Sequence, residues 1–308
     1  MNHRKFFYAL LALMIGCGAA VSMGRLDSNI SLDSAREIWS DVLRDADQFG
    51  LHATRVPAGE EMRLGNEVAD EIRSSWGSED PDAEKYVAAV GAELVPLVNR
   101  KAIQYHFHVI RSPEINAFAI PGGHIYVLTG LLDFLHSEAE LAAVLGHEMS
   151  HVDLRHCIER YQYELALKKA GAGDVGELAH FAHDLATLGY TQFQELEADA
   201  SGERIAIEAG YDPDAAEAVF KRMKVNFGET TPRPAATPGG EVGQAVGQAI
   251  GSYFETHPPS EDRARQMADM VAKNHRRLAG TVVYVGVANY RGRIPRSREE
   301  LSSEKRVY

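Results

Sequence analysis

The sequence has few cysteines and no long apolar run in its interior. Only two cysteines, Cys17 and Cys157, occur among 308 residues. If Cys17 is cleaved off or modified with an export segment, Cys157 stands alone and no intrachain disulfide can form. No internal apolar run reaches the roughly 18 residues that suggest a membrane-spanning helix. These shortages exclude a small scaffold held by disulfides and a protein that crosses a membrane several times.

Basic residues are also scarce. The chain has 32 Lys and Arg against 44 Asp and Glu, which gives a formal net charge of -12. Nucleic acids and anionic lipid surfaces attract clusters of Lys and Arg, so an acidic protein is a poor partner for either. We therefore expect no nucleic-acid partner and membrane attachment only through a lipid anchor.

The first 22 residues have the features of an export signal. A short basic stretch precedes the apolar residues 6–15, and small residues follow. The letters Met-Ile-Gly-Cys that end at Cys17 resemble a bacterial lipoprotein box, in which Cys17 would be acylated. The alternative is ordinary cleavage after Ala20 or Ser22. We expect a protein of the periplasm or cell envelope, anchored to the outer membrane if Cys17 is acylated.

The central motif is His147-Glu148-Met-Ser-His151. Residues four apart share one face of a helix, so both imidazoles can bind one ion while Glu148 lies beside them. Two imidazoles and one further ligand leave a position on zinc open for water, whose pKa then falls from about 15.7 to about 7. The motif therefore predicts a zinc hydrolase with one Zn²⁺ per chain and Glu148 as general base.

The surroundings of the motif support this interpretation. Ser137 and Glu140 form a capping-box pattern, and apolar residues at helical spacing follow, so the motif should lie on a half-buried helix. Before it, an apolar run is broken by a Pro-Gly-Gly turn and resumes as an alternating strand. We expect this strand to be a sheet edge that binds substrate backbone by strand addition. Its candidate substrate-binding residues are His124, Ile125, Tyr126 and Val127.

The third ligand must come from another segment, and Glu195-Leu-Glu-Ala-Asp199 offers it. Glu195 and Glu197 lie about 200° apart on a helix, so only one can face the metal, whereas Glu195 and Asp199 share a face. Gly202, one turn further on, would let this helix approach closely. The alternative to a metal-binding role is that Glu195 and Asp199 lie on a solvated acidic face of the helix.

Other candidate ligands are set aside. His156 lies five residues after His151, about 140° round the helix, and is not expected to share the site. Cys157 is interpreted as a small buried side chain on the same helix. His106 and His108 alternate on one face of a strand, where a solvated face is preferred over a metal pair.

Four ordered segments carry a resemblance: NAFAIPGG, ELAAVLGHEMSH, ELEADASG and THPPSEDR. Together they resemble the zinc metallopeptidases of the CAAX prenyl protease type 1 family. That family includes bacterial heat-shock membrane proteases and the periplasmic protease that assists β-barrel assembly. The resemblance covers roughly residues 58–275 and favours the periplasmic branch, because no internal span is present. It implies an α+β, zincin-like (gluzincin) fold, mostly helical, with one small sheet whose edge strand borders the metal cleft.

The resemblance also implies roles for single residues. His147, His151 and Glu195 would bind zinc, and Asp199 would hold the ring N–H of one ligand histidine. Arg263 and His257 belong to the last motif. His257 has three open interpretations: it occupies the open zinc position and makes the protease latent, it donates to the oxyanion of the tetrahedral intermediate, or it merely caps the following helix. The first two make it a candidate catalytic residue.

The expected organisation is a signal at 1–22, a helical extension at 23–57, a peptidase domain at 58–275 and a tail at 276–308. Helices are expected at 60–76, 83–98, 191–209, 212–227 and 260–275, and a strand at 281–288. The implied function is hydrolysis of unfolded or misassembled envelope proteins, with outer-membrane assembly machinery as a further partner. The rival is a chaperone-like assembly factor with structural zinc, which would have no need of Glu148.

Overall fold

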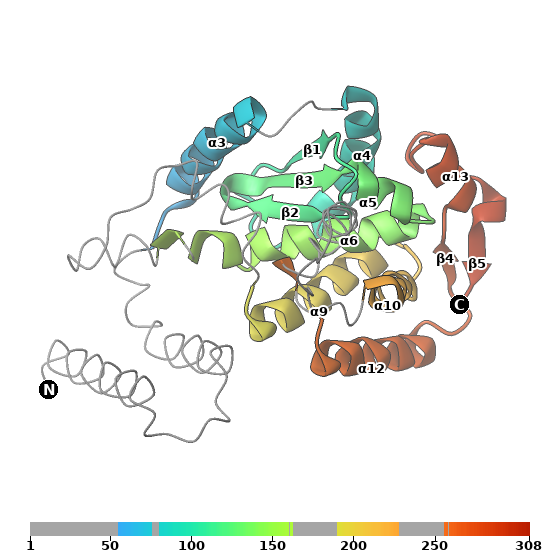
Figure 1. Ribbon diagram of the computed structural model, residues 1–308. Helices are drawn as coiled ribbons and strands as arrows, with labels where there is room; N and C mark the ends of the chain where they lie inside the picture. The colour runs from blue at the N-terminus through green and yellow to red at the C-terminus, as the bar shows by residue number, and fades with distance from the viewer. Residues whose placement is uncertain (1–54, 76–79, 160, 163–189, 228–255, 258) are drawn as a thin grey trace, which may run out of the picture. The chain divides into compact units, whose positions relative to one another are not determined.

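The computed structural model describes residues 55–75, 80–159, 161–162, 190–227, 256–257 and 259–308, which Figure 1 draws in colour. The predicted signal, the lipidation site Cys17 and nearly all of the 23–57 extension lie outside the described residues. Among those described, no helix has the length and apolarity needed to cross a bilayer.

A three-stranded sheet lies at the centre of the described chain (Figure 1). Its strands are β1 (His106–Ile110), β2 (Ala117–Ile120) and β3 (His124–Leu128). The order is β1-β3-β2, with β3 parallel to β1 and antiparallel to β2. Between β2 and β3, the short turn η2 (Pro121–Gly123) reverses the chain with Gly122 at φ 82° and Gly123 at φ 96°, values that favour glycine.

The prediction that residues 124–127 form the sheet edge is therefore wrong. They lie in β3, which is paired along both sides. The Pro-Gly-Gly turn was anticipated, but the parallel pairing with β1 joins segments separated by a long connection and leaves no local trace in the sequence. Within the described residues, β2 is the edge strand on the far side from β1.

Helices cover the two faces of the sheet. On one face, α3 (Ala58–Ser75) buries Leu64, Val68 and Ile72 against Phe118 and Tyr126. The other face contributes Ala117, Ala119, Ile125 and Val127 to the main core, where α4 (Pro81–Leu94) and α6 (Glu138–Asp153) pack. The period of two along each strand separates the two sets. α6 thus lies directly beneath the sheet (Figure 1).

α6 starts as predicted but is more buried than predicted. Ser137 accepts the backbone N–H of Glu140 at 3.2 Å, yet the Glu140 carboxylate accepts from His136 instead of closing the capping box. All 16 residues of α6 are buried, so the expected half-buried helix is in fact enclosed on all sides.

The chain breaks direction immediately after α6. The helix ends at Asp153, and Arg155 has φ 73°, a left-handed conformation that few residues other than glycine adopt. Helical backbone resumes at residues 156–159. The prediction that Cys157 continues the motif helix is therefore wrong, although its expected burial is confirmed at 0% exposure. Burial raises the pKa of its thiol to about 12.

Helix α9 (Gln192–Glu208) crosses α6 at very short range. It begins with a complete capping box between Thr191 and Gln194. A Cβ atom added at Gly202 would lie 2.6 Å from the backbone nitrogen of His147, and one added at Gly146 would lie 2.7 Å from the Gly202 carbonyl oxygen. Only glycine fits at both positions, which confirms the expected close approach.

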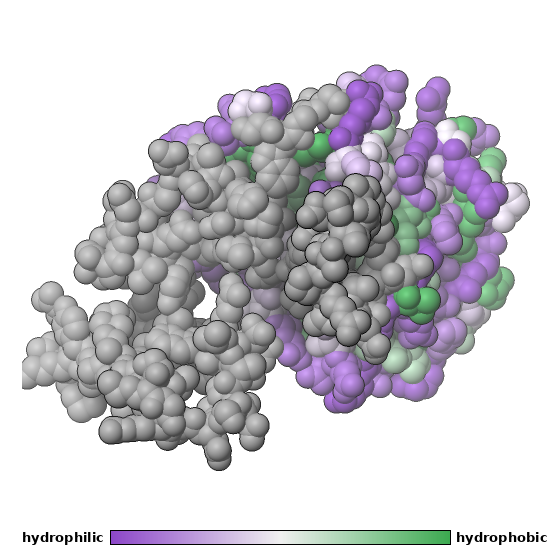
Figure 2. Space-filling view, in the orientation of Figure 1, coloured by the Kyte–Doolittle hydropathy of each residue, from purple (hydrophilic) through white to green (hydrophobic). Residues whose placement is uncertain are grey.

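The remaining elements surround these helices. They are η1 (Val95–Leu97), α5 (Thr129–Phe134), α10 (Ala215–Phe227), α12 (Glu261–Arg277), β4 (Val282–Tyr284), α13 (Val287–Gly292), η3 (Ser302–Glu304) and β5 (Lys305–Val307). β4 and β5 form a separate antiparallel pair, so the strand predicted over 281–288 is shorter, because Gly286 takes a left-handed conformation before α13. Figure 2 shows a largely hydrophilic surface over α12.

Candidate metal centre

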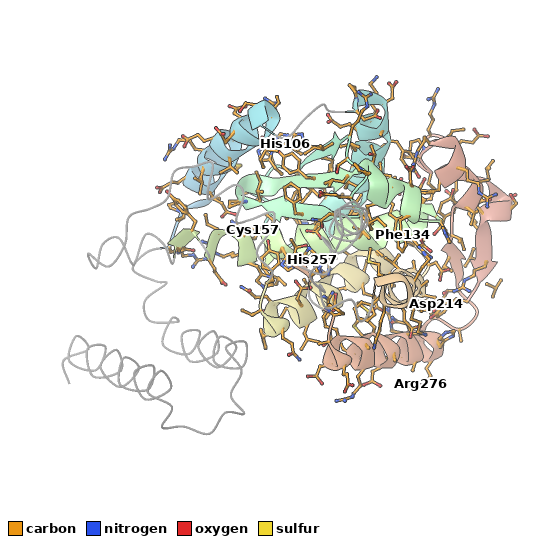
Figure 3. All side chains as sticks on the ribbon, in the orientation of Figure 1. His106, Phe134, Cys157, Asp214, His257 and Arg276 are labelled. Atoms are coloured by element: carbon orange, nitrogen blue, oxygen red, sulfur yellow. The ribbon has the colours of Figure 1, made fainter. Side chains whose placement is uncertain are left out.

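Four buried side chains converge between α6, α9 and the segment that precedes α12. They are His147, His151, Glu195 and His257, and Figure 3 labels His257 at this junction. The Nε2 atoms of His147 and His151 are 3.1 Å apart, and His257 Nδ1 lies 3.2 Å from His147 Nε2. Glu195 Oε1 lies 3.0 Å from His257 Nδ1 and 3.6 Å from His151 Nε2.

These separations fit a tetrahedral ion. Ligand atoms about 2.0–2.1 Å from zinc in a tetrahedron are roughly 3.3 Å from one another. Five contacts among these four side chains measure 3.0 to 3.6 Å, and the four candidate ligand atoms all lie within 4.8 Å of one another. Imidazole nitrogen and carboxylate oxygen are ordinary zinc ligands. Burial holds the pKa of His151 well below its usual range, so its ring is neutral. The predicted set of His147, His151 and Glu195 is brought together, and His257 joins it as a fourth corner.

Glu148 and His257 face each other within this centre. Glu148 is completely buried, and His257 Nε2 lies 3.2 Å from its Oε1. Burial alone would lower the pKa of His257, but the carboxylates of Glu148 and Glu195 outweigh it and raise that pKa to about 10. One imidazole ring thus touches both the motif carboxylate and the ligand carboxylate.

Asp199 and Arg263 form a buried support beneath the ligands. Asp199 Oδ1 lies 3.0 Å from His147 Nδ1, as the resemblance implied. Arg263 donates two hydrogen bonds of 2.8 Å to the Asp199 carboxylate and lies 2.6 Å from Glu195 Oε2. Although burial alone would raise the pKa of Asp199, the Arg263 guanidinium helps to hold it below its usual range. Arg263 also donates to the carbonyl of His257, which fixes the fourth corner to the same support.

The backs of the ligand rings are held by residues that sequence reasoning missed. His156 Nδ1 lies 3.0 Å from His151 Nδ1, although helical geometry placed it away from the site. Tyr190 stacks on the His151 ring, with centroids 3.7 Å apart. The turn at Arg155 brings His156 back, and no periodic pattern indicates such a turn. The positive φ of a non-glycine residue has no reliable sequence signature.

A second buried carboxylate lies further along α9. Glu203 is 7% exposed, and it accepts a hydrogen bond from Asn274 of α12. Burial, followed by the charge of Asp199, raises the pKa of Glu203 to about 7. This carboxyl group lies one turn beyond Asp199 on α9.

The residues predicted to bind substrate lie elsewhere. His124 packs on the sheet face toward α3, where it contacts His108 and Asn66, and Figure 3 shows His106 of that face well away from His257. Burial and His108 lower the pKa of His124 to about 3. His106 is exposed and His108 half-buried, so only the first matches the expected solvated face. The strand connected to the metal centre is β2: its preceding residue Asn116 contacts Thr256, the neighbour of His257.

Comparison with known families decides the class. The sequence model of Peptidase family M48 matches residues 81–271, which is more than half of the chain. The chain belongs to peptidase family M48. Its fold is accordingly zincin-like, and its four-residue centre suits a zinc ion. The resemblance drawn from the four sequence segments is confirmed.

Three relatives of this M48 peptidase are similar to it over different shares of their length. It is 30% identical over 221 residues to the mitochondrial metalloendopeptidase OMA1 of Schizosaccharomyces pombe, covering 68% of this chain and 60% of that protein. It is 30% identical over 185 residues to the β-barrel assembly-enhancing protease of Escherichia coli, covering 54% and 38%. Metalloprotease YcaL of Escherichia coli is 25% identical over 287 residues, covering 88% and 99%. The chain thus spans less than two thirds of the first two proteins.

Proposed function

We propose that this M48 peptidase hydrolyses peptide bonds in unfolded or misassembled cell-envelope proteins, with His147, His151 and Glu195 as zinc ligands and Glu148 as general base. The observation that carries the proposal is the buried ligand set, with ligand atoms within 4.8 Å of one another and Glu148 in contact with its His257. A structural zinc site would be complete without that carboxylate.

The chemistry divides between the ion and the chain. Zinc, when bound, polarises the scissile carbonyl and lowers the pKa of the attacking water. Glu148 accepts a proton from that water while the new carbon–oxygen bond forms, and delivers it to the amide nitrogen as the carbon–nitrogen bond breaks. Asp199 holds the back of the His147 ring, and Arg263 holds Asp199.

We propose that the described arrangement is a latent one. His257 Nδ1 occupies the fourth corner of the ligand set, and His257 Nε2 faces Glu148. One ring therefore blocks both the position needed by water and the carboxylate needed to deprotonate it. Activation requires His257 to leave, and its hydrogen bond to Arg263 is one of the contacts that must break. Once displaced, the same ring can donate to the oxyanion of the tetrahedral intermediate.

Substrate backbone is proposed to add to the open side of β2 instead of β3. Within the described residues, β2 is paired only with β3, and its neighbour Asn116 reaches Thr256 beside the metal centre. Strand addition requires an extended segment, which folded proteins rarely offer. The similarity to the β-barrel assembly-enhancing protease of Escherichia coli supports envelope clients and outer-membrane assembly machinery as partners. A lipid anchor at Cys17 would place the enzyme there.

The test compares wild type with Glu148→Gln. Both proteins are loaded with zinc, their metal content is measured, and cleavage of an unfolded protein such as reduced casein is followed. We expect equal zinc and a loss of about two to four orders of magnitude in rate for the variant. If loaded wild type and variant hold the unfolded client equally and neither cleaves it, the chaperone-like function replaces the enzyme.

A further inference from the structure

The two motif histidines have different partners behind their rings, and the partner of His151 is a third histidine, His156. His147 has a carboxylate, Asp199, behind its ring. Behind the His151 ring stands His156, with the two Nδ1 atoms 3.0 Å apart and both residues buried. A nitrogen–nitrogen contact of this length requires one proton between the two atoms, because two lone pairs would repel.

The direction of that hydrogen bond follows from the ligand set. His151 Nε2 faces His147 and Glu195, so its lone pair must be free when the ring binds a metal. A neutral imidazole carries one proton, which must then sit on Nδ1. His151 Nδ1–H therefore donates, and His156 Nδ1 accepts.

We propose that His156 is a positioning residue that fixes the tautomer and orientation of His151 for metal binding, as an inference that rests on the proposed zinc-peptidase function. His156 is not one of the converging ligands, and it acts through the His151 ring. It does for one ligand histidine what Asp199 does for the other. Partners behind a metal-bound histidine typically contribute about 10- to 100-fold in metal affinity.

A neighbouring carboxylate favours the tautomer of His156 that can accept a hydrogen bond at Nδ1. Glu197 Oε2 lies 3.4 Å from His156 Nε2, which favours a proton on Nε2 and leaves Nδ1 free to accept. Glu197 is 38% exposed, so solvent weakens its influence. It is not one of the converging ligands, and α9 therefore serves the two histidines differently: Asp199 directly, Glu197 through His156.

The ring of Tyr190 and the backbone conformation at Arg155 also hold His151 and His156 in place. Tyr190 lies flat on the His151 ring, with an interplanar angle of 19°, and leaves rotation in the ring plane unrestrained. A hydrogen bond at Nδ1 stops that remaining rotation. The left-handed backbone at Arg155 sets the height of His156 behind the ring. His156 and Tyr190 thus restrain different motions of one ligand.

The experiment uses the matched pair His156→Asn and His156→Leu. The two replacements have the same branching and number of heavy atoms, but only the Asn Oδ1, which stands near the place of Nδ1, can accept from His151. Zinc affinity is measured by competition with a fluorescent chelator, and ligand geometry by the visible absorption of the Co²⁺-substituted protein. We expect a loss of about 10- to 100-fold for Leu with an altered Co²⁺ spectrum, and near wild-type values for Asn.

A purely structural role would give another pattern. If Asn and Leu lower zinc affinity equally, or if neither changes it, the proposal is overturned. Should His156→Leu fail to fold, Glu197→Leu replaces it, with an expected weakening of about two- to fivefold, and Glu208→Leu on the exposed part of α9 serves as its control. Equal affinities for these two variants would also overturn the proposal. A zinc-loaded wild type without peptidase activity would refute the proposed function and leave the affinity result standing.

Discussion

The substitution Gly202→Ala tests how the crossing of two helices sets the metal centre. The added methyl group would lie 2.6 Å from the backbone nitrogen of His147, where ordinary contacts begin near 3.4 Å. The obstructing atoms are backbone atoms of Gly146 and His147 on α6, so no side chain can turn away. α9 must move from α6 by about 0.8 Å, the difference between these distances.

That displacement exceeds what zinc tolerates. Glu195 lies seven residues before Gly202 on the same rigid helix, and ligand distances in metal sites are held within about ±0.2 Å. We expect zinc affinity to fall by more than the roughly 10- to 100-fold typical of a lost outer partner. Overpacking costs about 1–3 kcal/mol, and the better helix propensity of Ala returns up to about 1 kcal/mol. A net loss of about 0–2 kcal/mol should remain in the metal-free protein.

The assays are zinc stoichiometry after dialysis against a weak chelator and urea unfolding of the metal-free protein. Gly59→Ala is the matched control: Gly59 is exposed in the first turn of α3, and a Cβ there meets no atom within 4 Å. The control should keep its zinc and its stability. If Gly202→Ala retains full zinc and unfolds at the wild-type urea concentration, the helix contact does not position the ligand.

The remaining predictions concern single side chains of the same centre. Glu195→Ala should abolish zinc binding while Glu197→Ala keeps a zinc ion in every chain, as measured by metal analysis; the reverse result would mean that the ligand register on α9 is wrong. His257→Ala should speed zinc removal by a chelator, because the fourth corner opens; unchanged chelation and unchanged proteolysis together would exclude both roles of His257. Glu203 has a folded-state pKa raised to about 7, so its protonated form favours folding: that stability is complete below about pH 4.5 and is lost as pH rises through 7. Glu203→Gln should therefore remove about 2–3 kcal/mol of the decline in unfolding free energy between pH 5 and 8, and urea unfolding curves with equal pH dependence would contradict this.

Local patterns predicted the two metal helices well. The N-cap Ser137, the start of the second helix near residue 191, the four-residue spacing of His147 and His151, and the glycine at 202 are all encoded within a few residues. Side chains one turn apart share a face whatever the rest of the chain does. The resemblance was needed for His257, which comes from a segment 110 residues after His147.

The predictions were wrong where the structure depends on pairing between distant segments or on an unusual backbone conformation. β3 was expected at the sheet edge because the hairpin with β2 is local, whereas its parallel pairing with β1 is not. His156 was correctly excluded as a ligand, but continuing the helix through Arg155, which in the structure has a positive φ, hid its contact with His151. Helical wheels fail at the first residue that leaves the helix, and neither composition nor periodicity marks that residue.

The complete enclosure of α6 also determines the order in which the protein can assemble. Its amides should be among the last to exchange with deuterium, because no local opening exposes a helix that is covered on every side. Until α9 docks, the two histidines of α6 lack their acidic partner, and an ion bound by them alone is held weakly. Metal binding is thereby coupled to the docking of α9 onto α6. A cell that withholds zinc would lower the free energy of unfolding and shorten the lifetime of the enzyme, so metal supply governs its abundance as well as its activity.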